Sequence, residues 1–311
     1  MIQFGWRTPD FPVDGSGTLA FRDQHFEFLD AVQGRLDSAW VADHFVPWMA
    51  SRDQSTDTFE CWTTLVYLTA KYPRLKFGTI VMSQGYRPPA LLAKMAANLQ
   101  VLSGGRFILG IGAGWKKDEY LAYGYPFPPA AERIHQLDEA VQIIRGMFTQ
   151  AKTTFHGKYY HVDEAICEPK PTPQVPIMIG GSGRKLTLRV VAKYADWWNG
   201  VNASPEEFAD AAEVLAEHCR AVGRDPDSIV KTFSSDCVAV AASGAEAERL
   251  AQQSPFYNPQ SGLVGTPDQV AERIRQYTAL GVEHFILRFA DFPRTAGADL
   301  FIREVLPRFR D

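Results

Sequence analysis

The sequence predicts one (β/α)₈ barrel over residues 1–311, an α/β fold in which eight parallel strands are wrapped by helices. Eight segments rich in apolar and β-forming residues alternate with segments whose apolar residues recur at helical spacing. This alternation favours parallel strands joined by right-handed crossovers. No change in composition marks a second domain, and a chain of 311 residues has the usual length of such a barrel. An open, doubly wound sheet is the alternative architecture.

The expected strands are short apolar runs bounded by glycine, proline or polar residues. The fourth is the clearest, because residues 107–111 are apolar apart from Gly110 and lie between two glycine-rich turns. Such a continuous run is typical of a strand that is buried on both faces. We expect strands at residues 2–6, 38–42, 75–82, 107–111, 177–179, 195–201, 230–241 and 284–289.

The segments between these strands are expected to be helices, because their apolar residues lie three or four positions apart. One of them begins at Pro89, and proline at a first helical position costs no hydrogen bond. We expect helices at residues 21–35, 59–72, 89–102, 132–148, 185–193, 205–222, 267–280 and 300–309.

Two segments fall outside this alternation. Residues 153–167 alternate between apolar and polar side chains and contain His156-Gly157-Lys158, which predicts a small hairpin outside the main sheet. A proline-rich connector follows at residues 169–176. Residues 243–265 are the least regular part of the chain, and we expect an exposed insertion there.

Composition and charge argue against several classes of protein. The chain has 32 basic and 36 acidic side chains, a net charge of −4, which gives no reason to expect nucleic acid as a partner. No apolar run approaches the roughly 20 residues that a membrane helix needs, and no basic segment precedes a signal core. The four cysteines form no CxxC pair, so we expect reduced thiols in a cytoplasmic protein. A small-molecule substrate is the expected partner, and the sequence leaves a homodimer open.

The active site of a barrel of this kind lies at the carboxyl ends of its strands. These ends hold too few ligands for a metallohydrolase, which needs three or four, so we expect no metal site. They also lack the Gly-x-Ser-x-Gly elbow of a serine nucleophile. The residues at these ends are Trp6, Asp43, His44, Met82, Ser83, residues 112–115, residues 180–183, residues 199–202 and Arg288.

Glycine-rich turns follow the fourth and the fifth strands. Gly112 and Gly114 come directly after the fourth strand, and the polar residues 116–119 beyond them are compatible with the start of a helix. Gly180-Gly181-Ser182-Gly183 follows the fifth strand. Backbone N–H groups in such turns, at the starts of helices, can receive a phosphate group. A tight turn without a ligand is the alternative explanation.

Tryptophan is also frequent near these ends. Trp6, Trp48 and Trp115 can wall a flat, conjugated ligand, although packing in the core or at the barrel mouth is the alternative for each. Together with the glycine turns, they are typical of a site for a planar cofactor that carries a phosphate.

His44 is the best candidate for acid–base chemistry, because an imidazole exchanges protons near neutral pH. Asp43 precedes it and can turn toward the mouth if the strand ends there. A histidine that only hydrogen-bonds a loop is the alternative. The other six histidines lie in expected helices, in the hairpin or at a strand start, and we expect them to be structural.

The sequence resembles the bacterial-luciferase-like flavin and deazaflavin oxidoreductases over nearly its whole length. The ordered set of stretches is more specific than any single motif. The phrases Glu-Pro-Lys-Pro and Ile-Gly-Gly-Ser-Gly look closest to members that use the deazaflavin coenzyme F420. The stretches that carry the resemblance are residues 40–44, 78–83, 89–115, 132–148, 169–183 and 195–200.

The resemblance implies a (β/α)₈ barrel with an insertion and a flavin-type ring at the strand ends. It implies catalytic roles for Asp43, His44 and Trp48 beside the ring. It also implies a bulge with a cis peptide bond at Ile80–Val81, which backs the ring. The cofactor contacts it implies are Asp43, His44, Ile80, Val81, Ser83, Ala113, Gly114, Trp115, Gly180, Gly181, Ser182 and Gly183.

One position departs from part of the family. Members similar to the sugar-phosphate-oxidising dehydrogenases carry a catalytic glutamate after the glycines of the fourth strand, where this chain has Trp115. This departure argues against sugar-phosphate oxidation and suggests a more apolar substrate pocket. The predicted function is hydride transfer between F420 and a small organic substrate. A monooxygenase that uses reduced FMN and a non-catalytic flavin-binding protein are the alternatives.

Overall fold

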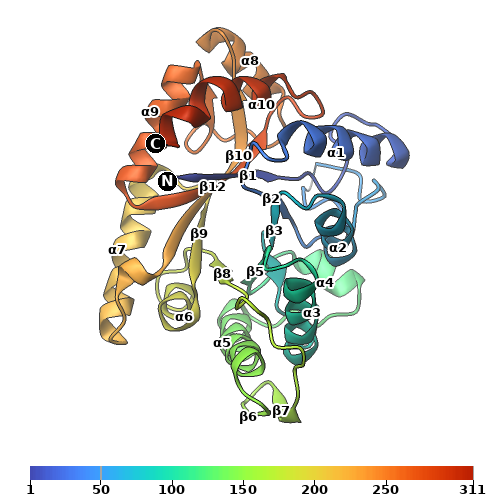
Figure 1. Cartoon of the computed structure of the whole chain (residues 1–311), viewed down its shortest axis with the longest axis vertical. Coiled ribbons are helices and arrows are strands. Elements are labelled where there is room, and N and C mark those ends of the chain that lie inside the picture. Colours follow the sequence, from blue (N-terminus) through green and yellow to red (C-terminus); the bar gives the residue numbers. More distant parts are fainter. Residues whose placement is uncertain (50, 311) are drawn as a thin grey trace.

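The computed structural model describes residues 1–49 and 51–310, and these form the closed barrel that the sequence predicts (Figure 1). Neighbouring strands pair in parallel around the barrel, which closes where β10 pairs with β9. In barrel order the strands are β1 (Gln3–Arg7), β2 (Ser38–Val41), β3 (Lys76–Thr79), β5 (Phe107–Gly112), β8 (Ile177–Gly180), β9 (Trp197–Val201), β10 (Val230–Val240) and β12 (Val282–Phe289).

The third strand is broken into two parts, whereas the sequence predicts one continuous strand at residues 75–82. β3 ends at Thr79, and β4 (Met82–Ser83) resumes the pairing with β5. The peptide bond between Ile80 and Val81, in the break, is cis, as the family resemblance implied. The break turns the chain at the carboxyl end of the strand, where the sequence places the candidate site.

Helices cover the outside of the barrel in the order expected (Figure 1). Local sequence fixes several of their starts: α7 and α9 each begin with a capping box, from Ser204 with Glu207 and from Thr266 with Gln269, followed by a proline. The helices are α1 (Thr18–Val32), α2 (Cys61–Lys71), α3 (Pro89–Leu102), α4 (Lys117–Ala122), α5 (Ala130–Thr149), α6 (Thr187–Tyr194), α7 (Pro205–Ala221), α8 (Gly244–Gln253), α9 (Pro267–Ala279) and α10 (Ala296–Leu300). Beyond α10 the helix continues with π geometry to Val305 and with 3₁₀ geometry to Phe309.

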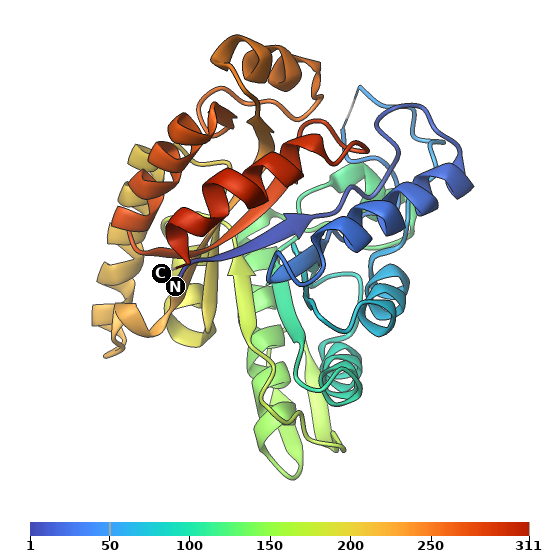
Figure 2. The same ribbon diagram turned by 45° about the horizontal axis from the view of Figure 1, so that its top comes forward.

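The predicted hairpin is present as β6 (Thr153–His156) and β7 (His161–Ala165), an antiparallel pair outside the barrel sheet. Figures 1 and 2 show it at the end of the molecule opposite α8.

Residues 243–265 are more regular than the sequence suggested. They contain α8 and a short strand, β11 (Leu263–Gly265), which pairs in parallel with the end of β10. The helix buries Ala247 and Ala251 against this extension of the sheet. Two alanines four positions apart give only a weak apolar stripe, so the sequence carries little signal for this helix.

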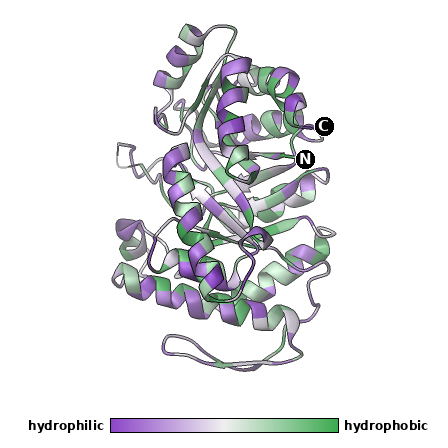
Figure 3. Cartoon of the chain, turned by 90° about the vertical axis from the view of Figure 1, so that its left-hand side faces the viewer, coloured by the Kyte–Doolittle hydropathy of each residue, from purple (hydrophilic) through white to green (hydrophobic). Residues whose placement is uncertain are grey.

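Buried apolar residues of the strands and the surrounding helices form the main core. Figure 3 shows hydrophobic and hydrophilic residues alternating along the helices around the barrel. A second, smaller cluster fills the inside of the barrel with Trp40, Ile80, Ile108, Met178 and Ile286. Gly78 on the neighbouring strand leaves room for the Trp40 ring, because a Cβ there would collide with it. Since the barrel interior is packed, a ligand site must lie above it, at the strand ends.

Among the described residues, no helix combines the length and the apolar character that crossing a membrane requires.

Candidate active site

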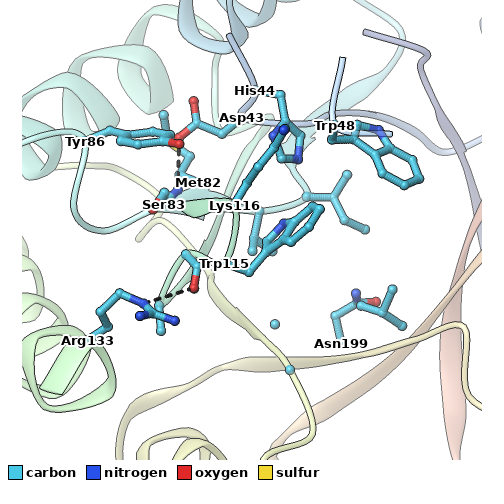
Figure 4. A pocket seen from close by; sticks show the side chains of 18 of the residues that line it. Asp43, His44, Trp48, Met82, Ser83, Tyr86, Trp115, Lys116, Arg133 and Asn199 are labelled. Atoms are coloured by element: carbon cyan, nitrogen blue, oxygen red, sulfur yellow. Dashed lines mark hydrogen bonds between the residues drawn. The ribbon is translucent and has the colours of Figure 1, made fainter. Parts of the chain in front are cut away.

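A cavity of about 520 Å³ lies at the carboxyl ends of the strands (Figure 4). Most of the residues predicted for the site line it, which brings together the ends of β2, β4, β5 and β8. The predicted residues in its wall are Asp43, His44, Trp48, Ile80, Val81, Ser83, Ala113, Gly114, Trp115, Gly180 and Gly181.

Three residues expected near the ligand do not line this cavity. Ser182 and Gly183 are exposed and lie beyond its edge. Trp6 is fully buried on the helix side of β1 and stacks on Phe28 with the ring centroids 4.3 Å apart. Side chains alternate along a strand, so the next residue, Arg7, faces the cavity instead.

His44 follows β2 and projects into the cavity between Trp48 and Trp115 (Figure 4). Its Nδ1 lies 3.0 Å from Oε2 of Glu119, whose side chain is fully buried. Within residues 1–49 and 51–310, Nε2 of His44 has no hydrogen-bond partner. The imidazole is therefore held at one nitrogen, while the other is free for a ligand.

Glu119 in α4 is a site residue that sequence reasoning missed. Its other oxygen accepts hydrogen bonds from the backbone N–H groups of Phe45 and Val46, and Oε2 also accepts one from the Tyr86 hydroxyl. Burial alone would raise its pKa, but the hydrogen bonds from His44, Phe45 and Tyr86 hold the pKa of Glu119 below its usual range. The carboxylate is therefore ionised at neutral pH. Its position five residues beyond Gly114, at a helix start, was the available signal.

Asp43 lines the cavity, but its hydrogen bonds do not go to His44. Its carboxylate pairs with Arg87, with Nη1 2.9 Å from Oδ2, and accepts the backbone N–H of Ser83 at 2.9 Å. Burial raises the pKa of Asp43, and the Arg87 guanidinium opposes that effect. Arg87 also contacts Glu60 at the start of α2. Asp43 thus ties the end of β2 to β4 and α2.

Aromatic side chains form one wall of the cavity. Trp48 and Trp115 lie edge to face with ring centroids 6.5 Å apart, and Phe256 stacks on Trp48. Trp115 is 60% exposed and stands at the mouth, whereas the Trp48 indole N–H is buried without a hydrogen-bond partner among the described residues. This wall offers a largely apolar, aromatic surface to a bound molecule.

Backbone rather than side chains forms the opposite wall. The cis peptide at Ile80–Val81 lies beside Gly112 and Gly180, where a Cβ would approach the Val81 side chain. Gly114 has a φ of 76°, and a Cβ there would collide with the Tyr120 hydroxyl, which hydrogen-bonds Ser83. Glycine is required at this turn both for its conformation and for this close approach.

A cation that the sequence analysis did not single out lies at the glycine end of the cavity. Arg133 of α5 packs over the Phe127 ring at 3.8 Å and donates to the carbonyl of Gly114 at 3.3 Å. Figure 4 shows its guanidinium directed toward the cavity. The wall here also includes Gly181, with a φ of 121°, and Thr187 at the start of α6. Backbone N–H groups, a hydroxyl and a guanidinium form a donor set that suits phosphate.

The fold is a (β/α)₈ barrel, and its strand-end cavity combines an aromatic wall with a group of donors that suits phosphate. Residues 31–262 match the model of the luciferase-like monooxygenases, and the chain belongs to this family. It is an enzyme that takes a flavin or a deazaflavin.

Relatives of both cofactor types are similar to this chain. The F420-dependent glucose-6-phosphate dehydrogenase of Amycolatopsis mediterranei is 27% identical, over 88% of this chain and 90% of that protein. The FMNH(2)-dependent dimethylsulfone monooxygenase of Pseudomonas putida is 30% identical, over 72% of this chain and 71% of that protein. A solved F420-dependent secondary alcohol dehydrogenase, in complex with an F420–acetone adduct, superposes with a TM-score of 0.82 at 21% identity, over 100% of this chain and 99% of that one. The last likeness concerns the fold alone.

Proposed function

We propose that this protein is an F420-dependent oxidoreductase that moves a hydride between the deazaflavin and a small organic substrate, with His44 as proton donor or acceptor. The observation that carries the proposal is the His44 imidazole in the cavity, held at Nδ1 by a buried carboxylate while Nε2 bonds none of the described residues. When bound, a deazaflavin supplies two-electron hydride chemistry, which leaves the accompanying proton to the protein. A positioned imidazole suits that role near neutral pH.

The other walls of the cavity support binding of the same cofactor. Trp48 and Trp115 can cover the ring and keep water from it, and the Ile80–Val81 peptide can back it. The glycine turn at Gly181, together with Arg133, would hold the phosphate.

A charge placed at the glycine turn tests this phosphate site. Gly181→Asp should lower cofactor affinity at least about tenfold, or roughly 1.4 kcal/mol, because a carboxylate would face the phosphate. Titration of the folded variant with cofactor measures the loss. Gly223→Asp is the matched control, since Gly223 also has a positive φ, of 71°, and lies past α7 away from the cavity. Equal affinity of the Gly181 variant and the wild type would remove this turn from the site.

A monooxygenase that uses reduced FMN and oxygen is the second candidate function. One observation favours it, the 30% identity to a dimethylsulfone monooxygenase.

Turnover assays with and without oxygen separate these candidates. The proposal predicts substrate-dependent change in the redox state of F420 that proceeds equally well in the absence of oxygen. Oxygen consumption that requires reduced FMN and the protein would support the monooxygenase. Turnover of neither kind on alcohols, carbonyl compounds and activated alkenes would contradict hydride transfer to or from these classes of substrate.

A further inference from the structure

We propose that Glu119 is a positioning residue for His44: its carboxylate holds the imidazole with the proton on Nδ1, so that Nε2 is the nitrogen that exchanges protons in the cavity. The tautomer follows from the hydrogen bonds that Glu119 accepts, together with the ionised state of its carboxylate. Only the last step, proton exchange with a substrate, rests on the proposed function.

The hydrogen-bond directions decide the tautomer. An ionised carboxylate has no proton and can only accept. Oε1 of Glu119 accepts from the Phe45 N–H at 2.6 Å and the Val46 N–H at 3.2 Å, and Oε2 accepts from the Tyr86 hydroxyl at 2.9 Å. The remaining contact, 3.0 Å to Nδ1 of His44, must therefore be donated by the imidazole. A neutral imidazole that carries its proton on Nδ1 has a lone pair on Nε2.

The two backbone hydrogen bonds also set where the imidazole lies. They anchor the residues directly after His44 to α4, from which Glu119 projects, so one side chain fixes both the ring and the turn that carries it. Such an arrangement of an imidazole and a buried carboxylate is how a general base is oriented in hydrolytic triads.

The other charged groups around the imidazole are already engaged. Asp43, at the end of β2, is paired with Arg87, and Lys116, in the turn after β5, lies 2.5 Å from Asp118. Among the described residues, Glu119 is thus the carboxylate that bonds the ring.

The first test reads the tautomer directly, without substrate or cofactor. The nitrogen chemical shifts of the His44 imidazole are assigned by comparison with His44→Asn. At a pH at which the ring is neutral, they should show a protonated Nδ1 and an unprotonated Nε2. In Glu119→Gln the amide oxygen can still accept the backbone N–H groups while its NH₂ group donates to Nδ1. The two nitrogen signals should then exchange character. An Nε2-protonated ring in the wild type, or an unchanged tautomer in the variant, would overturn the proposal.

The second test separates positioning from structure by kinetics. In the reaction direction in which His44 accepts the proton, Glu119→Gln should lower kcat by about 10²-fold or more, because a proton on Nε2 blocks its role as a base. Cofactor affinity should be unchanged. Glu139→Gln is the matched control: Glu139 likewise accepts backbone N–H groups from a turn, those of Lys158, Tyr159 and Tyr160, but lies under the hairpin outside the cavity. Its kcat should equal that of the wild type. If kcat fell equally in both variants, the loss would reflect removal of any carboxylate that accepts backbone N–H groups from a turn. That result would contradict the proposal.

The two tests also distinguish this inference from the proposed function. The expected tautomer together with full activity of His44→Asn would refute the role of His44 in proton transfer and leave its hydrogen bond to Glu119 intact. The opposite tautomer in an active F420-dependent enzyme would refute the role of Glu119 alone.

Discussion

Replacing His44 with asparagine is expected to lower kcat by about 10²–10⁴-fold, the range usually contributed by a positioned general acid or base. Asparagine keeps an N–H group that can bond Glu119, but it cannot exchange a proton near neutral pH. Because the ring of His44 forms only part of the cavity wall, cofactor affinity should change little. Steady-state turnover with a competent substrate, together with a cofactor titration, measures both quantities.

A histidine outside the cavity serves as the control for this substitution. His161 is exposed on β7 of the hairpin, so His161→Asn should leave kcat and cofactor affinity at their wild-type values. If His44→Asn turned over substrate at a near-normal rate, His44 would be a packing residue, and the proton would have to come from solvent or from the substrate.

Replacing Arg87 with leucine is expected to lower the free energy of unfolding by about 3–5 kcal/mol, the usual cost of leaving a buried charge without its partner. Arg87 makes three hydrogen bonds to Asp43, whose side chain is fully buried, and one to Glu60. Without the guanidinium, the Asp43 carboxyl must lose its charge or the end of β2 must move. Urea unfolding followed by circular dichroism measures the loss.

An exposed ion pair gives the comparison for this prediction. Arg22 pairs with Asp23, and their side chains are 48% and 53% exposed, so Arg22→Leu should cost no more than about 1 kcal/mol. If the two variants were equally stable, the Arg87–Asp43 pair would contribute no more than a surface contact, and the tie between β2, β4 and α2 would need another explanation.

Much of the fold was predictable because its signals are local. Short apolar runs between glycines located the strands, and the apolar spacing together with prolines at helix starts located most of the helices. Pro89–Leu102 matches its expected range to the residue. The helix in residues 243–265 was missed because its buried stripe consists of two alanines, Ala247 and Ala251.

The candidate site was predictable as far as strand ends define it. His44, Asp43 and the glycine turns lie where a parallel barrel must bring strand ends together, and these residues do line the cavity. Trp6 was expected beside the ligand, but its side chain points the other way. Side chains alternate along β1, so Arg7 faces the cavity and Trp6 faces the helices.

The residues that hold the site residues in place could not be predicted from the sequence. Glu119 is 75 positions from His44 in the sequence, and Arg87 is 44 positions from Asp43, so no local spacing links either pair. Arg133 comes from the face of a long helix and looks like an ordinary surface arginine until α5 is placed beside the turn after β5. Such contacts depend on tertiary packing and are read only from the folded chain.

The central claim, that the cofactor is a deazaflavin, is tested most directly by measuring the dissociation constants of the purified protein for F420 and for FMN under the same conditions. The account predicts that F420 binds at least about tenfold more tightly, a difference of roughly 1.4 kcal/mol. Equal affinity for the two cofactors, or tighter binding of FMN, would contradict it and favour the monooxygenase.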